Sequence, residues 1–222
     1  MINDTFYKSL IEKLDRENVK LVAVSKTKPD EDIRILYDLG QRIFGENKVQ
    51  ELTSKHEVLP KDIDWHMIGH LQRNKVKYIA PFVSLIHGID SFKLLNEVNK
   101  QAIKNNRVIN CLLQIHIAEE ETKFGFSTNE LFDLLKSDEF KNLENIKIIG
   151  LMGMATNTTD KDKVKREFSR LKQIFDEVKQ MYFSDEPAFS VLSMGMSGDY
   201  NLAIESGSTM VRIGSLLFGS RD

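Results

Sequence analysis

The stretch KLVAVSKTKP, residues 20–29, is the part of the sequence around which the predicted fold is built. Residues 21–24 form a short apolar run, with the length and composition typical of a strand buried in a parallel sheet. Pro29 disfavours a helical conformation at Lys28 and so ends the element. Lys26 therefore stands at the carboxyl end of a buried strand.

Lys26 shares a face with Val22 and Val24 if the alternation of the strand continues as far as the lysine. If that face lines the interior of a barrel, the amine stands at the mouth of an apolar cavity, where burial lowers its pKa. A neutral amine can attack an aldehyde and form a Schiff base. Taken alone, a lysine after a strand is more often a solvated loop residue. Lys28, further out on the same face, is a rival.

Apolar periodicity divides the chain into alternating helices and strands. A leading amphipathic helix is predicted over residues 2–17, because Phe6, Leu10, Ile11 and Leu14 recur at helical spacing. After the strand at 20–25, further strands are predicted at 42–44, 64–68, 83–86, 108–117, 146–150, 189–192 and 210–213. Helices or short helical turns are predicted after them, at about 30–39, 48–56, 73–80, 91–105, from 127 or 128 onward, 161–181 and 200–205, with a last turn after Gly214.

Strands that alternate with helices predict parallel pairing through crossovers. Eight such units behind a leading helix, in 222 residues, point to an α/β fold: a single (β/α)8 TIM barrel domain over residues 1–222. The main competitor is an open doubly wound sheet. The sequence contains no GxGxxG and no Walker loop, so the nucleotide-binding versions of that competitor lose support.

The composition excludes several classes of function. A net charge of -2 leaves no electrostatic footprint for nucleic acid. No apolar run reaches the roughly 18 residues that a membrane span needs, and the polar N-terminus is unlike a signal peptide. The single cysteine, Cys111, cannot form an internal disulfide, which fits a reducing cytoplasm. We therefore expect a cytoplasmic protein. We also expect a monomer, because the sequence has no obvious exposed apolar stripe.

Two segments after the last strands have the composition of a phosphate site. In TIM barrels the site is built from loops at the carboxyl ends of the strands, and phosphates bind after strands seven and eight. Here those loops are SMGMSG, from residue 193, and RIGS, from residue 212. Both combine serine hydroxyls with glycines, which let a backbone approach a ligand closely. Each alone would also fit an N-cap and a tight turn.

Arg212 is unusual because it lies within an apolar strand, between Val211 and Ile213. Arginine is rarely buried without a partner. It is either an ion-pair partner at the barrel mouth or a donor to an anion or a ring nitrogen of a ligand.

Other chemistry has less support. His66 and His70 are four residues apart, but Gly69 argues against one shared helical face and no third ligand is in register, so we do not expect a metal site. The segment GMSGD lacks the G-x-S-x-G pattern, and nothing suggests a Ser-His-Asp triad.

Seven motifs are specific in combination: LVAVSKTKP at 21–29, FGENKVQE at 44–51, WHMIGHLQRNK at 65–75, KFGF at 123–126, GLMGMA at 150–155, SMGMSGD at 193–199 and GSTMVRIGSLLFG at 207–219. With them the chain resembles, from the first helix to Arg221, the pyridoxal phosphate homeostasis proteins, the small single-domain relatives of the alanine racemase barrel. The resemblance implies an alanine racemase-like TIM barrel that binds pyridoxal 5′-phosphate (PLP), the vitamin B6 cofactor.

The resemblance also implies roles for individual residues. In that family the lysine matching Lys26 carries PLP as a Schiff base, which favours Lys26 over Lys28. Arg212 matches the arginine that faces the pyridine nitrogen. The remaining implied contacts are to the phosphate, from Ser193, Gly214 and Ser215, and beside the ring, from Asn47.

An arginine at the pyridine nitrogen donates a hydrogen bond and cannot accept one, so the ring nitrogen is left unprotonated and the cofactor is a weaker electron sink. This suits a racemase and equally a carrier. Racemisation needs two acid/base groups on opposite faces of the substrate carbon. The larger racemase relatives take one from a second domain, which we do not expect in 222 residues. We therefore expect a non-catalytic protein that buffers PLP or delivers it, with PLP-dependent apo-enzymes as partners.

Two alternatives stay open. A PLP-dependent amino-acid racemase needs a base opposite Lys26, for which His70, His116 and Tyr200 are candidates. A Schiff-base aldolase of the same fold would be colourless, and its lysine would be trapped only with substrate present. Many relatives have an asparagine where this chain has His116, so the resemblance leaves the role of His116 open.

Overall fold

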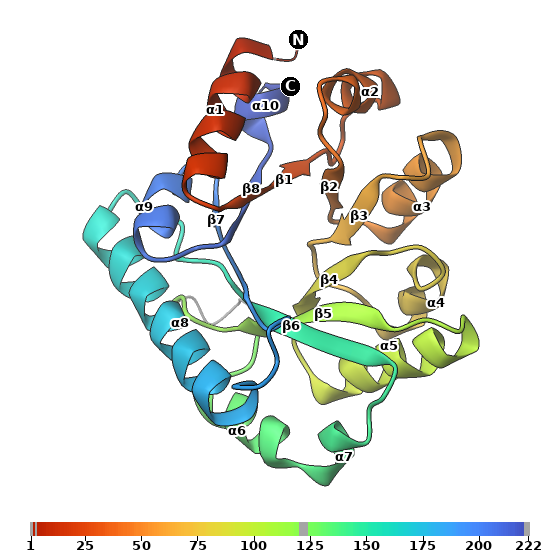
Figure 1. Ribbon diagram of the computed structural model, residues 1–222, viewed down its shortest axis with the longest axis vertical. Helices are drawn as coiled ribbons and strands as arrows, with labels where there is room; N and C mark the ends of the chain where they lie inside the picture. Colours follow the sequence, from red (N-terminus) through yellow and green to blue (C-terminus); the bar gives the residue numbers. More distant parts are fainter. Residues whose placement is uncertain (1, 3, 120–123, 220–222) are drawn as a thin grey trace.

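Eight parallel strands close into a barrel in chain order, with β8 paired to β1 (Figure 1). This computed structural model describes residue 2, residues 4–119 and residues 124–219, so Lys123 of the KFGF motif lies outside the described residues. The predicted (β/α)8 barrel is confirmed. The strands are β1 Lys20–Val24, β2 Ile43–Glu46, β3 Asp64–Met67, β4 Leu85–Ile89, β5 Ile109–Ile115, β6 Ile146–Gly153, β7 Val191–Met196 and β8 Met210–Ile213.

Helices surround the barrel, and α1 precedes the first strand as predicted (Figure 1). The predicted helix over 73–80 is a 3₁₀ turn, η1, followed by one turn of α-helix, and the short α7 was not predicted. The helices are α1 Asp4–Arg16, α2 Asp30–Asp38, α3 Val49–Val58, η1 Arg73–Lys75, α4 Val76–Ile79, α5 Phe92–Lys104, α6 Thr128–Lys136, α7 Asp138–Lys141, α8 Lys161–Tyr182, α9 Tyr200–Glu205 and α10 Ser215–Phe218.

Serine side chains fix the start of α5 and of α6. Ser91 accepts a hydrogen bond from the backbone N–H of Leu94 and so caps α5. Ser127 caps α6 in a capping box, in which Glu130 reaches back to the backbone N–H of Ser127. Helix α6 therefore begins at Thr128.

Four strands end later than predicted, and two of them are β2, which ends at Glu46 rather than at residue 44, and β6, which ends at Gly153 rather than at residue 150. β4 ends at Ile89 rather than at residue 86, and β7 ends at Met196 rather than at residue 192. In β4 and β7 a polar residue, His87 or Ser193, stopped the apolar run, but both are fully buried and hydrogen-bonded inside the barrel. A polar residue with a partner continues a strand as well as an apolar one does.

The core has two layers. Large side chains such as Trp65, Phe44 and Phe168 fill the space between the strands and the helices. A smaller cluster fills the barrel interior, and it consists of Val22, Leu85, Leu112, Met152 and Met210. Val22 thus faces inward, as the alternation along the first strand predicted.

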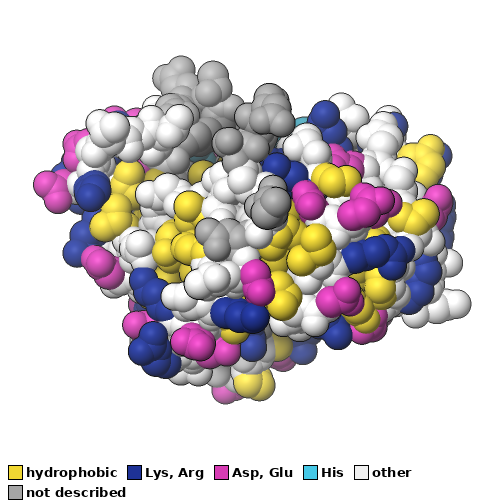
Figure 2. Space-filling model, turned by 90° about the horizontal axis from the view of Figure 1, so that it is seen from above, with side chains coloured by type: hydrophobic (Ala, Val, Ile, Leu, Met, Phe, Trp, Pro, Cys, Tyr) yellow, Lys and Arg dark blue, Asp and Glu magenta, His cyan; other side chains and the backbone are white. Residues whose placement is uncertain are grey.

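The outer surface carries charges of both signs. On the face seen in Figure 2, lysine and arginine side chains alternate with aspartate and glutamate and with small apolar areas. Within the described part of the chain, none of the helices has the length and apolar character of a membrane span.

Gly150 is a position where the fold depends on the absence of a side chain. It follows the register shift between Cys111 and Leu112 in the β5–β6 pair, and its φ is +156°. A Cβ at this position would overlap the carbonyl oxygen of Val191 on β7. Neighbouring strands could not keep their spacing around it.

We predict that Gly150→Ala lowers the free energy of unfolding by about 3 kcal/mol or more, because the backbone of β6 or β7 must move to relieve the overlap. Urea unfolding followed by circular dichroism measures the change. Gly198→Ala is the matched control, because a Cβ there has no atom within 4 Å. Equal midpoints for the two variants would contradict this account of the β6–β7 contact.

Candidate functional site at the mouth of the barrel

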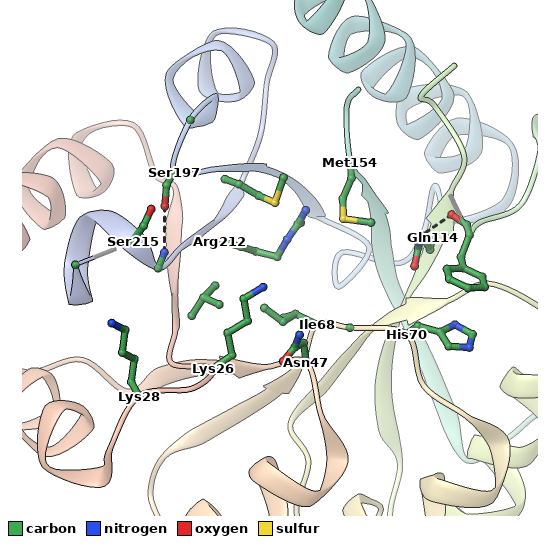
Figure 3. Close-up of a pocket in the computed structure, with 17 residues that line it drawn as sticks. Lys26, Lys28, Asn47, Ile68, His70, Gln114, Met154, Ser197, Arg212 and Ser215 are labelled. Atoms are coloured by element: carbon green, nitrogen blue, oxygen red, sulfur yellow. Dashed lines mark hydrogen bonds between the residues drawn. The ribbon is translucent and has the colours of Figure 1, made fainter. Parts of the chain in front are cut away.

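A cavity of about 430 Å³ opens at the carboxyl ends of the strands (Figure 3). Loops after β1, β2, β3, β7 and β8 contribute to its wall, together with Gln114 of β5 and Met154 after β6. Of the predicted site residues, five line this cavity: Lys26, Asn47, Arg212, Gly214 and Ser215. The topology therefore brings together residues from the two ends of the chain.

Lys26 and Lys28 lie on one turn but point in different directions. Figure 3 shows the amine of Lys26 pointing into the cavity towards Arg212, and Lys28 pointing towards α10. The Nζ of Lys28 donates a hydrogen bond of 3.0 Å to the carbonyl oxygen of Phe218 in α10. The turn that carries both lysines is closed by a 3.0 Å hydrogen bond from the backbone N–H of Lys28 to the carbonyl oxygen of Ser25. Thr27, between the two lysines, has a left-handed φ of +64°.

Arg212 is buried at the bottom of the cavity, with 4% of its surface exposed. Its Nη1 donates to the carbonyl oxygen of Ser193 at 2.9 Å and to Ser193 Oγ at 2.6 Å, and its Nη2 donates to the carbonyl oxygen of Gly153 at 3.2 Å. Burial lowers the pKa of the guanidinium to about 10, so it keeps its charge at neutral pH. Uncharged oxygens hold this cation, and none of the described carboxylates forms an ion pair with it.

The loops after β7 and β8 meet at one side of the cavity. The backbone N–H of Gly214 donates to Ser197 Oγ at 3.2 Å, and Ser215 lies beside them (Figure 3). Gly214 approaches β1 closely, since an added Cβ would lie 3.0 Å from the carbonyl oxygen of Val24. Ser193, by contrast, is fully buried and does not line the cavity. The phosphate contact predicted for Ser193 stays a prediction, and Ser197 is the serine of this loop at the cavity wall.

Comparison with known proteins identifies the family. The family model "Alanine racemase, N-terminal domain" matches residues 7–222. A pyridoxal phosphate homeostasis protein of Aquifex aeolicus is 43% identical over 203 residues, which cover 91% of this chain and 87% of that protein. The chain belongs to the pyridoxal phosphate homeostasis protein family. The resemblance drawn from its motifs is therefore confirmed.

Solved structures agree with this family and its fold. PipY of Synechococcus elongatus, solved with PLP bound, is 33% identical, with a TM-score of 0.81 over 91% of this chain and 93% of that one. An alanine racemase of Clostridium difficile has a TM-score of 0.75 at 13% identity, and the match covers 99% of this chain but 57% of that one. The second likeness shows the alanine racemase-like barrel alone.

Two buried histidines, His87 and His66, extend the hydrogen-bond network of Arg212 and Ser193 into the barrel. His87 Nδ1 lies 3.1 Å from Ser193 Oγ, and His87 Nε2 lies 3.0 Å from His66 Nδ1. Burial lowers the pKa of His66 to about 3 and that of His87 well below its usual value, so both are neutral. This pair was not predicted from the sequence, because the two residues lie on separate strands, β3 and β4.

His70 is separated from His66 and lines the cavity. Its ring stacks on Phe124 at 4.0 Å between centroids, and its Nδ1 lies 3.0 Å from Asp90 Oδ2. The other two residues considered as bases, His116 and Tyr200, do not line the cavity.

A cluster of buried charges lies beneath the turn that carries Lys26. Lys55 Nζ donates to Glu46 Oε1 at 2.8 Å, to Glu51 Oε1 at 2.7 Å and to the carbonyl of Ser25 at 2.8 Å. Glu46 Oε1 also accepts from Ser25 Oγ at 2.6 Å, and Glu51 accepts from the backbone N–H of Thr27. The backbone on both sides of the candidate lysine is thus fixed by one ion cluster.

The charges of this cluster are interdependent because they are buried. Lys55 and Glu46 are 5% and 0% exposed. Burial raises the pKa of the Glu46 carboxyl, and the charge and hydrogen bond of Lys55 oppose that rise. This cluster was not predicted from the sequence, because charged residues at helical spacing are usually solvated.

We predict that Lys55→Met lowers the free energy of unfolding by about 3–5 kcal/mol, because it leaves Glu46 as a buried charge without a partner. The double variant Glu46→Gln/Lys55→Met should recover most of the loss. Urea unfolding measures both. Lys8→Met, which breaks the exposed Asp4–Lys8 pair, is the control and should leave the midpoint nearly unchanged. A midpoint for Lys55→Met like that of the control would refute the buried ion cluster.

The buried histidine pair predicts a pH dependence of stability. Below pH 6.5 the unfolded chain takes up protons at His66 and His87, while the folded protein keeps both neutral. Their contribution to stability is therefore present above pH 6.5 and is lost as the pH falls towards 3. We expect a loss of roughly 1.5 kcal/mol per histidine between pH 6.5 and about pH 5.

Urea unfolding at a series of pH values measures this slope. The comparison is His66→Phe/His87→Phe, which should be less stable at neutral pH but should lose less stability over the same pH range. Equal slopes for the two proteins would contradict the assignment of two neutral histidines.

Proposed function

We propose that this protein binds PLP reversibly as a Schiff base on Lys26 and buffers or delivers the cofactor inside the cell, without turning over amino acids. The observation that carries the proposal is the convergence of an amine, a buried guanidinium and two serine–glycine loops on one cavity. PipY, the relative solved with PLP bound, supports the choice of ligand.

The residues present fit PLP group by group. The amine of Lys26 can condense with the aldehyde, so that a C=N bond replaces C=O and one water leaves. Hydroxyls of Ser197 and Ser215 and the close backbone at Gly214 suit the phosphate. Asn47 stands at the cavity wall, where we propose that it contacts the side of the ring. A volume of about 430 Å³ is in the usual range for a small-molecule site.

Arg212 explains why binding need not lead to catalysis. PLP acts in enzymes as an electron sink, and a protonated ring nitrogen strengthens that property. Arg212 is a donor only and keeps its proton at neutral pH. We propose that it donates to the ring nitrogen and keeps it unprotonated, so that the bound cofactor activates amino acids weakly.

A racemase-like activity is the second candidate, and the cavity wall gives it one observation. The ring of His70, oriented by Asp90, could hold or move a proton. Proton NMR in D₂O would detect this activity as loss of the α-hydrogen signal of a free amino acid. Turnover by the purified protein that is lost in His70→Gln would favour this candidate over the carrier.

For the carrier we predict a yellow protein whose visible band disappears on borohydride reduction, with the label on the peptide that contains Lys26. Lys26→Ala should abolish the reducible band, because Lys28, the other described lysine at the cavity wall, points towards α10 and donates to the carbonyl oxygen of Phe218. Lys28→Ala is the matched control on the same turn, and it should keep the band. Absorption spectra and peptide mapping measure both.

Two outcomes would contradict the proposal. A label that maps to Lys28 would show that the Schiff base forms on Lys28 rather than on Lys26. A colourless protein that takes up no added PLP, and whose lysine is trapped only with an aldehyde or ketone substrate, would favour an aldolase instead.

A further inference from the structure

Four side chains form a hydrogen-bonded row from the cavity into the barrel interior. The row runs from Arg212 Nη1 to Ser193 Oγ at 2.6 Å, from Ser193 Oγ to His87 Nδ1 at 3.1 Å, and from His87 Nε2 to His66 Nδ1 at 3.0 Å. All four residues are at most 5% exposed. The row crosses the barrel, since its members come from β8, β7, β4 and β3.

The strand geometry explains why these polar groups meet. His87 and Arg212 each lie two positions beyond an inward-facing apolar residue, Leu85 and Met210. Because side chains two apart share a face of a strand, both polar groups also face inward, one layer nearer the cavity. At His87 and Arg212 the row therefore lies between the apolar plug of the barrel and the cavity.

Arg212 fixes the direction of the first hydrogen bond in the row. A guanidinium donates and cannot accept, so Ser193 Oγ is an acceptor in that bond. Ser193 Oγ has a second lone pair, so towards His87 Nδ1 it either accepts or donates its own proton. If Ser193 donates, the proton of His87 lies on Nε2. His87 Nε2–H then donates to His66 Nδ1, so His66 also carries its proton on Nε2.

We propose that Ser193, His87 and His66 are positioning residues, which orient the Arg212 guanidinium by a one-way row of hydrogen bonds so that it presents a donor to the cavity. That the donor meets the ring nitrogen of PLP rests on the proposed function. The acceptors in this row are neutral, so the row fixes the orientation of the guanidinium without neutralising its charge. A carboxylate in place of Ser193 or His87 would fix the orientation equally well but would cancel the charge.

The direction of the row can be measured without PLP. Long-range ¹H–¹⁵N NMR of protein labelled at its five histidines distinguishes a ring nitrogen that carries a proton from one that accepts. We expect His87 and His66 both to be protonated on Nε2 and not on Nδ1, and Ser193→Ala to move the Nδ1 signal of His87. A proton on Nδ1 of His87, or an imidazolium in either residue near pH 7, would overturn the row.

The effect on Arg212 is tested through PLP binding. In Ser193→Ala and His87→Leu we expect the dissociation constant of PLP to rise about tenfold, as for the loss of one hydrogen bond, and the pH midpoint of the visible band to shift. His87→Asn should stay closer to the wild type than His87→Leu, because the Asn oxygen can replace Nδ1 as an acceptor.

Ser208→Ala is the matched control. Ser208 is a buried serine whose Oγ bonds to backbone carbonyls of Leu192, Met194 and Met210, outside the row. We expect it to lower the melting temperature without changing PLP affinity or the pH midpoint. Equal changes in affinity and midpoint for Ser193→Ala and Ser208→Ala would show a general structural effect and overturn the positioning role. If the wild type takes up no PLP, the proposed function fails, and the NMR measurement still supports or overturns the direction of the row.

Discussion

A guanidinium that is buried at the mouth of the barrel and charged at neutral pH is the constraint on which the rest of the site depends. The register of β8 with β1 places Arg212 opposite Val22, so the last strand brings a cation beside the turn that carries Lys26. Removing such a charge from water is costly unless hydrogen bonds compensate it. The carbonyl oxygens of Gly153 and Ser193 and the hydroxyl of Ser193 supply that compensation. Backbone carbonyls of β6 and β7 and the hydroxyl of Ser193 thus compensate a charge that β8 brings into the barrel.

Polarity rises in steps along the barrel axis. An apolar cluster around Leu85, Leu112 and Met210 fills the middle of the interior. The next layer holds neutral polar groups, including His87 and Ser193, and beyond it the cavity opens to solvent. The apolar layer excludes water and so keeps both histidines neutral. Neutral histidines can accept and donate hydrogen bonds without adding a second charge below Arg212.

The sequence predicted what depends on local pattern and missed what depends on pairing across strands. Alternation along residues 20–24 was sufficient to place Val22 inside the barrel, and the end of that strand placed Lys26 at the mouth, on the turn that follows it. His66 and His87 contact each other only because β3 and β4 are neighbours in a particular register. The Lys55–Glu46 pair joins α3 to β2 in the same way. For Ser193, the resemblance gave a contact to a ligand, whereas the structure shows its hydroxyl bonded to Arg212 and His87.

Lys26 and Arg212 are fixed by opposite means, and the difference has a chemical consequence. Lys26 stands on a turn whose backbone is bonded by Lys55 and Glu51, and its amine faces the cavity. Glu46 bonds to Lys55 and to the hydroxyl of Ser25. Arg212 is secured through its own side chain, by neutral groups. On the proposed function, the amine of Lys26 is therefore available to form and break a covalent bond, while Arg212 keeps a fixed donor and its charge at neutral pH. On the same proposal Arg212 donates to the ring nitrogen and leaves it unprotonated, so the group that helps to retain the cofactor also limits its reactivity.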